Sequence, residues 1–206
     1  MSSKSAGKSR GKSGRGRTRI EKADVAVAKA LVPHQDHPVM RTIAAIADIG
    51  DQPPLQALSW SVLAAGLVTR KPRLAKAGAR MIVAHLFATV AKDMVKHRVD
   101  RTRPHVLEER DYEMKKGKRK DRELTSFPSG HTAGAVAVAQ AFARAYPEYR
   151  TPALGAAGVV ALAQIPRCAH YPTDVGAGAA IGVAAEWVVD RLLRIDDEGQ
   201  APYLRA

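Results

Sequence analysis

The chain has 206 residues, 33 Lys and Arg against 20 Asp and Glu, and a formal net charge of +13. Its one cysteine, Cys168, excludes an internal disulfide framework and a metal site built from cysteines. Hydrophobic residues make up 46% of the sequence but aromatic residues only 5%, which excludes a wholly disordered chain and a core built on aromatic side chains.

The chain begins with a basic segment. Residues 1–20 consist almost entirely of Ser, Gly, Lys and Arg and contain no carboxylate. Such a composition buries too little apolar surface to offset the entropy of ordering, so we predict a disordered tail over residues 1–22. No apolar stretch follows the basic residues directly, which excludes a secretory signal. The tail can contact anionic lipid headgroups, whereas nucleic acid is not an expected partner.

Residues 23–54 predict two short amphipathic helices, over 23–33 and 38–49, with Pro33 and Pro38 between them. Both helices keep charged residues, so neither is expected to span a bilayer. Residues 55–195 follow as the main helical bundle, and residues 196–206 form a second tail. The bundle contains five Ala-rich apolar segments, at residues 55–69, 81–95, 133–146, 152–166 and 175–193.

The composition of these segments favours helix, and no alternation of β-branched residues indicates a strand. We therefore predict an all-α fold, a compact bundle of about five membrane-embedded helices. Each segment has about 15 residues, fewer than the roughly 20 that span a bilayer, so a soluble bundle is the alternative. Small residues four apart, such as Gly178 and Gly182, favour the membrane because they let helices approach closely. We expect a multi-pass protein of the cell membrane.

Three polar blocks lie at the ends of these segments. Residues 96–104 follow the second segment, residues 128–131 (Pro-Ser-Gly-His) precede the third, and residues 167–174 lie between the fourth and the fifth. In a bundle of five alternating helices, all three ends emerge on one side. We expect the three blocks to meet there in a single site.

Two of the blocks contain the chemistry of an anion site. Lys96 and Arg103 supply positive charge, and the Arg fork can bind phosphate oxygens bidentately. Ser129 and Gly130 precede a helix, whose first backbone N–H groups point at an anion. The glycine also lets a ligand approach the backbone closely.

Two histidines complete this set. His131 follows directly at the same helix start, and His170 lies four residues before Asp174. A carboxylate bonded to one imidazole nitrogen fixes the tautomer and leaves the other nitrogen free to attack. Two histidines beside one phosphate therefore provide an attacking group and a proton donor. Taken singly, each suits a structural role, and the other five histidines have no partner at a diagnostic spacing.

The ordered pattern K-x6-RP, PSGH and H-x3-D on helix ends resembles the type 2 phosphatidic acid phosphatase superfamily, over roughly residues 40–195. That group includes lipid phosphatases, bacterial acid phosphatases and vanadium haloperoxidases. The resemblance implies a nucleophilic His170 that forms a phosphohistidine, oriented by Asp174, and a general acid, His131. It implies that the phosphate is held by a set of residues from the three blocks: Lys96, Arg103, Ser129 and Gly130. It also implies a reaction that needs no metal and no cofactor.

One position departs from this pattern. The family usually carries a phosphate-binding Arg six residues before the nucleophilic His, where this sequence has Gln164. The nearest arginine is Arg167, three residues before His170. Either Arg167 reaches the phosphate by a changed backbone path, or the site operates with one cation fewer.

The sequence therefore predicts a membrane phosphatase that hydrolyses a phosphate monoester or pyrophosphate of a lipid, of polyprenyl or glycerophospholipid type. The alternative is a catalytically weakened family member that acts as a membrane-anchored protein binding anionic lipid or nucleic acid. Neither the identity of the lipid nor the oligomeric state can be predicted from the sequence.

The side of the membrane that the site faces is open. With five spanning segments, the side that carries the tail and the three blocks has 22 Lys and Arg, and the other side has 10. Loops rich in positive charge stay in the cytoplasm, so this count favours a cytoplasmic site. Bacterial lipid phosphatases of the family that the chain resembles commonly face outward, which argues for the opposite side.

Overall fold

The computed structural model of the chain describes residues 17–117 and 121–200. Its longer helices are α1 (Arg19–Leu31), α2 (Pro38–Asp48), α3 (Gln52–Val68), α4 (Pro72–Lys96), α5 (Gly130–Ala145), α6 (Arg150–Ala163) and α7 (Pro172–Gln200). Its short 3-10 helices are η1 (Val32–His34), η2 (Pro104–Val106), η3 (Arg122–Leu124) and η4 (Pro147–Tyr149), and its strands are β1 (Val99–Arg101) and β2 (Met114–Lys116).

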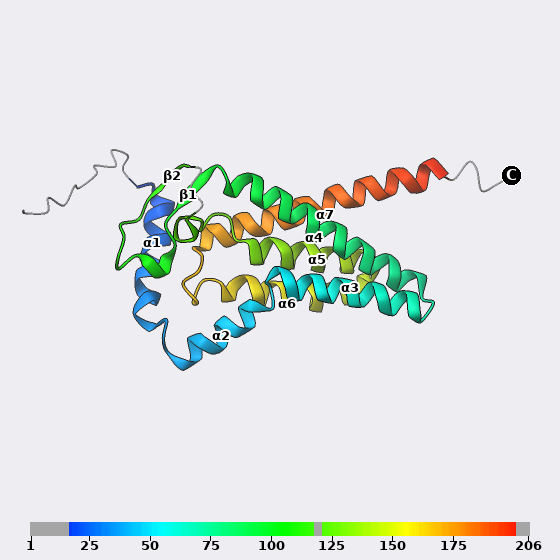
Figure 1. Cartoon of the computed structure of the whole chain (residues 1–206), viewed down its shortest axis with the longest axis horizontal. Coiled ribbons are helices and arrows are strands. Elements are labelled where there is room, and N and C mark those ends of the chain that lie inside the picture. The colour runs from blue at the N-terminus through cyan, green and yellow to red at the C-terminus, as the bar shows by residue number, and fades with distance from the viewer. Residues whose placement is uncertain (1–16, 118–120, 201–206) are drawn as a thin grey trace, which may run out of the picture.

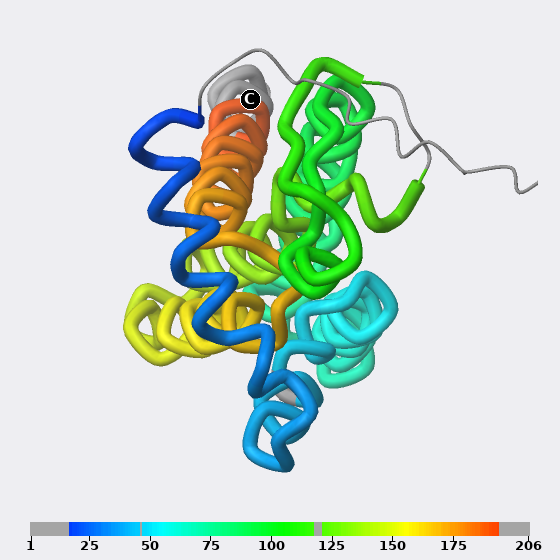
Figure 2. Tube along the Cα trace, turned by 90° about the vertical axis from the view of Figure 1, so that its left-hand side faces the viewer, coloured from blue at the N-terminus to red at the C-terminus, as the bar shows by residue number. Residues whose placement is uncertain are grey.

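Helices α3 to α7 run along the long axis of the molecule (Figure 1). Helix α5 lies at the centre of this bundle and contacts α3, α4, α6 and α7. Helix α1 and the two strands lie together at one end. Figure 2 looks at that end and shows α1 running across it.

The start of α1 is set by a capping box. The Thr18 side chain accepts a hydrogen bond from the backbone N–H of Glu21, and the Glu21 carboxylate accepts one from the backbone N–H of Thr18. The helix therefore begins at Arg19 and includes residues 19–22, which we had expected with the basic tail. Residues 1–16 of that tail lie outside the described residues, as do residues 201–206.

The prediction of a mainly helical fold is confirmed, with one exception. Strands β1 and β2 form an antiparallel pair in which Asp100 lies opposite Lys115. The pair lies in the long polar connection between α4 and α5. Only three residues of each strand pair, too few for the sequence to show an alternation that indicates a strand. Lys115 and Lys116 are exposed, and residues 118–120 lie outside the described part of the chain.

The prediction of five membrane helices is not confirmed by length and composition. Among the described residues, only α4 is both long and apolar enough to cross a membrane. Helices α3, α5 and α6 have 17, 16 and 14 residues and are shorter than a typical span. Helix α7 is long enough but contains Glu186, Asp190 and Arg191.

The core of the bundle is made of small residues. Most of the buried apolar side chains of α5 are alanines, and they pack against alanines and valines of α4 and α7. A methyl group added at Gly182 would lie 2.6 Å from the Ala133 carbonyl oxygen, so α7 approaches α5 at a distance that only glycine permits. The predicted small-residue contact of α7 is therefore present at Gly178 and Gly182, whereas nothing lies within 4 Å of a methyl group at Gly176.

The far end of the bundle holds a partly buried group of charges. The Arg80 Nη2 atom of α4 lies 2.5 Å from the Glu186 carboxylate and 2.7 Å from the Asp190 carboxylate of α7. Arg144, near the end of α5, lies 3.3 Å from the other oxygen of Glu186. Arg80 is thus paired with two carboxylates of α7 inside the bundle.

Candidate active site

A cavity of about 350 Å³ opens where α4 ends and α5 begins. Residues from all three polar blocks line it: Lys96, Arg103, Gly130, His131 and His170. The structure therefore brings together five of the eight residues predicted for the site. The rest of the lining comes from α4, α5, the start of α3 and the loop before it: Gly50, Asp51, Gln52, Pro53, His85, Ala88, Thr89, Lys92 and Gly134.

The imidazole of His170 is almost fully buried, with 2% of the residue exposed. Its Nδ1 atom lies 2.7 Å from the backbone carbonyl oxygen of Ser126. A carbonyl oxygen can only accept, so Nδ1 carries the hydrogen and Nε2 keeps its lone pair in the neutral ring. Burial lowers the pKa of His170 to about 4, so the ring is neutral at physiological pH.

Asp174 holds this histidine indirectly. Its Oδ2 atom lies 3.8 Å from His170 Nδ1, too far for a hydrogen bond. The same oxygen accepts hydrogen bonds from the Ser126 hydroxyl and, at 2.8 Å, from the Tyr171 backbone N–H. We expected a direct hydrogen bond between His170 and Asp174. Instead, His170 Nδ1 donates to the closer Ser126 carbonyl oxygen, and the Ser126 hydroxyl donates to Asp174.

A buried arginine anchors Asp174 from the other side. Arg101 of β1 is 1% exposed and donates to Asp174 and to Thr173. Its Nη2 atom lies 2.6 Å from the carboxylate of Asp24, which is itself 3% exposed and belongs to α1. Arg101 therefore lies between two buried carboxylates, which raise the pKa of its guanidinium despite its burial.

Lys96 and Arg103 approach the cavity from the first block. Lys96 is the last residue of α4, and Arg103 follows β1. The Arg103 guanidinium is held by the carbonyl oxygens of Arg122, at 2.8 Å from Nε, and Thr125, at 3.4 Å from Nη2. These bonds orient the side chain while leaving other N–H groups for a ligand.

The second block begins α5. Ser129 is fully buried and is the N-cap, with its hydroxyl oxygen 3.5 Å from the Thr132 N–H and 3.0 Å from the Thr132 hydroxyl. Its backbone N–H donates to the Asp174 carbonyl at 3.0 Å. Ser129 therefore lies beside the cavity without lining it, with its hydroxyl engaged by the start of α5 and its backbone N–H by α7. Gly130 and His131 line the cavity as expected.

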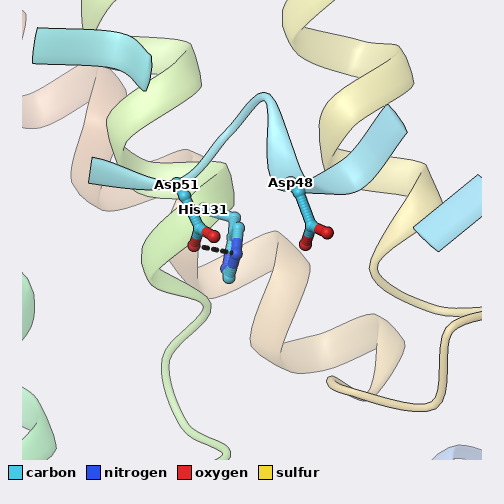
Figure 3. A group of neighbouring side chains, drawn as sticks. All are labelled: Asp48, Asp51 and His131. Atoms are coloured by element: carbon cyan, nitrogen blue, oxygen red, sulfur yellow. Dashed lines mark ion pairs between the residues drawn. The ribbon is translucent and has the colours of Figure 1, made fainter. Parts of the chain in front are cut away.

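Figure 3 shows His131 with two carboxylates of the connection between α2 and α3. The Nε2 atom of His131 lies 2.5 Å from the carboxylate of Asp51, and Asp48 lies on its other side. Together they form, within the described residues, the only group of three potential metal ligands whose atoms lie within 4.8 Å of one another. Asp48 also forms an ion pair with Arg167 at 2.7 Å, so the three residues and Arg167 form a network of ion pairs.

The departure at position 164 has a clear structural outcome. The Gln164 side chain is fully buried, and its amide nitrogen lies 3.4 Å from the Ala47 carbonyl and 3.3 Å from the Val160 carbonyl. Arg167 does not line the cavity and is engaged by Asp48. Neither residue lines the cavity, and the role of Arg167 as a phosphate ligand stays a prediction.

The comparisons agree with this arrangement. Residues 77–194, more than half of the chain, match the family model described as the PAP2 superfamily. The chain belongs to this superfamily. Comparison with curated protein sequences gave no match.

Two solved structures share the PAP2 fold of this chain. A transmembrane PAP2-type phosphatidylglycerolphosphate phosphatase from Bacillus subtilis is 20% identical, with a TM-score of 0.65 over 86% of this chain and 88% of that chain. Aquifex aeolicus LpxE is 21% identical, with a TM-score of 0.61 over 85% of this chain and 96% of that chain. At these identities the likeness establishes the fold alone.

Several residues in and around this site were not among those predicted from the sequence. Asp24 and Arg101 lie behind Asp174, Asp51 lies beside His131, and Lys92 lines the cavity one helical turn before Lys96. Only Lys92 had a detectable signal, because residues four apart on a helix share a face.

Proposed function

We propose that this PAP2 protein is a membrane phosphatase that hydrolyses a phosphate monoester or diphosphate of a lipid through a phosphohistidine on His170. The observation that carries the proposal is the meeting of two histidines, two motif cations and the start of α5 around one cavity. A cavity with this lining suits a tetrahedral anion that is attacked from one side and protonated on the other.

In the first step, the Nε2 lone pair of His170 attacks the phosphorus atom. The bond from phosphorus to the lipid oxygen breaks, and His131 gives its proton to that oxygen. The Asp51 carboxylate beside His131 stabilises the protonated ring before the transfer. The positive charge that forms on His170 is stabilised by Asp174, 3.8 Å from Nδ1.

In the second step, a water molecule attacks the phosphorus of the phosphohistidine. His131, now neutral, takes a proton from this water, and the bond from phosphorus to Nε2 breaks, which releases inorganic phosphate. Lys96, Arg103 and the backbone N–H groups at the start of α5 stabilise the charge on the phosphoryl oxygens in both steps.

A membrane location is supported by where large apolar side chains lie. The core is rich in alanine, whereas large side chains on several helices face outward; they include Trp60 at 57% exposed, Leu86 at 58%, Leu162 at 65% and Trp187 at 52%. A soluble bundle would bury such residues, and lipid accepts them. The printed description of the Bacillus subtilis structure, a transmembrane phosphatase, points the same way.

The experiment is phosphate release by the purified chain in detergent, with phosphatidate, phosphatidylglycerolphosphate and a polyprenyl diphosphate as substrates. We expect turnover of at least one lipid, its loss in His170→Ala, and its retention in His34→Ala, since His34 is exposed and lies outside the cavity. A radiolabelled substrate phosphate should be trapped on the parent protein and not on His170→Ala. Near-normal turnover by His170→Ala would refute the mechanism.

A second candidate function is a catalytically weakened protein that binds anionic lipid at the membrane. It is favoured by the positions of Gln164 and Arg167, neither of which lines the cavity. Phosphate binding without release from any of the three lipids would support this candidate over the first. The side of the membrane stays a prediction, although α1 does lie at the end of the bundle that holds the cavity, as the charge count assumed.

A further inference from the structure

A lysine outside the three polar blocks faces the cavity. Lys92 lies within the apolar part of α4, one helical turn before Lys96, and both side chains line the cavity. Only 13% of the Lys92 side chain is exposed. A lysine in an apolar helix is costly to place and usually marks a functional pathway or site.

The Lys92 side chain lies against the first residue of α5. A methyl group added at Gly130 would come within 2.9 Å of Lys92 Cδ and 3.7 Å of Nζ. The ammonium group is therefore adjacent to the N-terminus of α5, which carries a positive partial charge. Two positive groups repel each other at this separation unless an anion lies near both.

The charges around the cavity leave room for such an anion. Three cations line it, Lys92, Lys96 and Arg103, against one carboxylate, that of Asp51. Asp51 is already 2.5 Å from His131 Nε2. Lys92 has an ion pair with Asp93 at 3.0 Å, but Asp93 does not line the cavity and its side chain is 43% exposed. The cavity therefore has an excess of positive charge that suits a doubly charged phosphate group.

We propose that Lys92 is a further phosphate-binding residue of this site, acting with Gly130 at the start of α5. The proposal rests on the proposed function for the kind of anion involved. It also explains how the cavity keeps three cations although Gln164 is neutral and Arg167 is paired with Asp48. Gly130 is needed at its position because any larger residue would push Lys92 away from the helix start.

The test measures binding of orthovanadate and inorganic phosphate to the detergent-purified full chain by calorimetry, together with KM and kcat for a lipid substrate. Lys92→Gln should weaken binding of both anions by roughly 10- to 100-fold, the range expected for one charged hydrogen bond, and should raise KM more than it lowers kcat. Lys92→Arg should recover most of the binding. Lys92→Met, whose side chain fits a similar volume, replaces Lys92→Gln if that variant does not fold.

Two matched variants separate this role from a structural one. Lys76→Gln changes an exposed lysine of the same helix outside the cavity and should bind as the parent does. Asp93→Asn removes the ion-pair partner of Lys92 and should leave anion binding intact. Binding by Lys92→Gln within twofold of the parent, or an equal loss in Asp93→Asn, would overturn the proposal. A parent protein that binds phosphate through Lys92 but releases none from any lipid would overturn the proposed function and leave this inference standing.

Discussion

The burial of His170 predicts how the stability of the protein depends on pH. Burial lowers the pKa of this imidazole to about 4, whereas the ring in the unfolded chain titrates near the ordinary value of 6.5. Between these two values the unfolded chain binds a proton that the folded protein does not bind. The free energy of unfolding therefore falls as the pH is lowered from 6.5 towards 4, and this part of the stability is fully present above pH 6.5.

The size of this effect follows from the shift of the pKa. A shift from 6.5 to about 4 corresponds to about 3 kcal/mol for a fully buried ring. In His170→Asn the titrating group is gone, while an amide N–H can still donate to the Ser126 carbonyl. Groups that do not contact His170 titrate equally in both proteins, so the difference between the two pH profiles reports on His170 together with its neighbour Asp174.

The assay is denaturant unfolding of the parent protein and His170→Asn in the same detergent, at half-unit steps from pH 4 to pH 7.5. The parent should lose about 3 kcal/mol more than the variant between pH 7 and pH 4. The parent protein should also keep its catalytic turnover well below pH 6.5, because the nucleophilic imidazole of His170 stays neutral there. Parallel stability profiles for the two proteins would show that His170 titrates normally and would refute the lowering of its pKa by burial.

The other predictions concern residues around the cavity and at the far end of the bundle. Arg101→Met should lower the free energy of unfolding by about 3–5 kcal/mol, measured by denaturant unfolding, because it leaves buried carboxylates unpaired. Arg167→Ala should change vanadate affinity less than threefold, since its partner Asp48 is half-exposed and lies outside the cavity. Gln164→Arg should lower the melting temperature without raising kcat/KM, because the side chain is buried beside backbone carbonyls. Arg80→Met should lower the melting temperature with KM unchanged, since its acidic partners lie far from the cavity.

The site could be predicted from the sequence because its three blocks stand at the ends of apolar segments. The lengths of the segments fix where each helix ends, and the end of α4, the start of α5 and the segment between α6 and α7 then meet around one cavity. The contact of Asp24 with Arg101 joins residues 77 apart, from a helix outside the matched family region and a three-residue strand. No periodic pattern specifies such a contact, so neither residue could be assigned from the sequence.

Ser129 is a second position for which the sequence alone leaves two roles open. The sequence places it beside an anion site, and the structure uses its hydroxyl to cap α5. Both interpretations fit a serine before a helix, because serine is both a common N-cap and a possible phosphate ligand. What decides between them is the tertiary contact of its backbone N–H with the Asp174 carbonyl, which turns the residue into the protein.

Helix α4 connects the cavity to the outer surface of the bundle. One face of the helix carries the cavity-lining residues His85, Lys92 and Lys96, and another presents apolar residues at four-residue spacing. Leu86, Val90 and Met94 are all more than half exposed. A phosphorylated lipid has the same division, with a charged headgroup attached to an apolar chain. A lipid whose chain lies along the outer face of α4 can therefore place its phosphate at the end of this helix, beside His170.

The two charged ends of the bundle fit the same arrangement. Asp190 lies 18 residues after Pro172, the first residue of α7, which corresponds to roughly 27 Å along a helix. The hydrocarbon core of a bilayer is about 30 Å thick. The ion pairs of Arg80 with Glu186 and Asp190 therefore lie about one bilayer away from the cavity end. For the membrane location proposed above, this position would put the acidic groups near the opposite surface, where Arg80 neutralises them within the bundle.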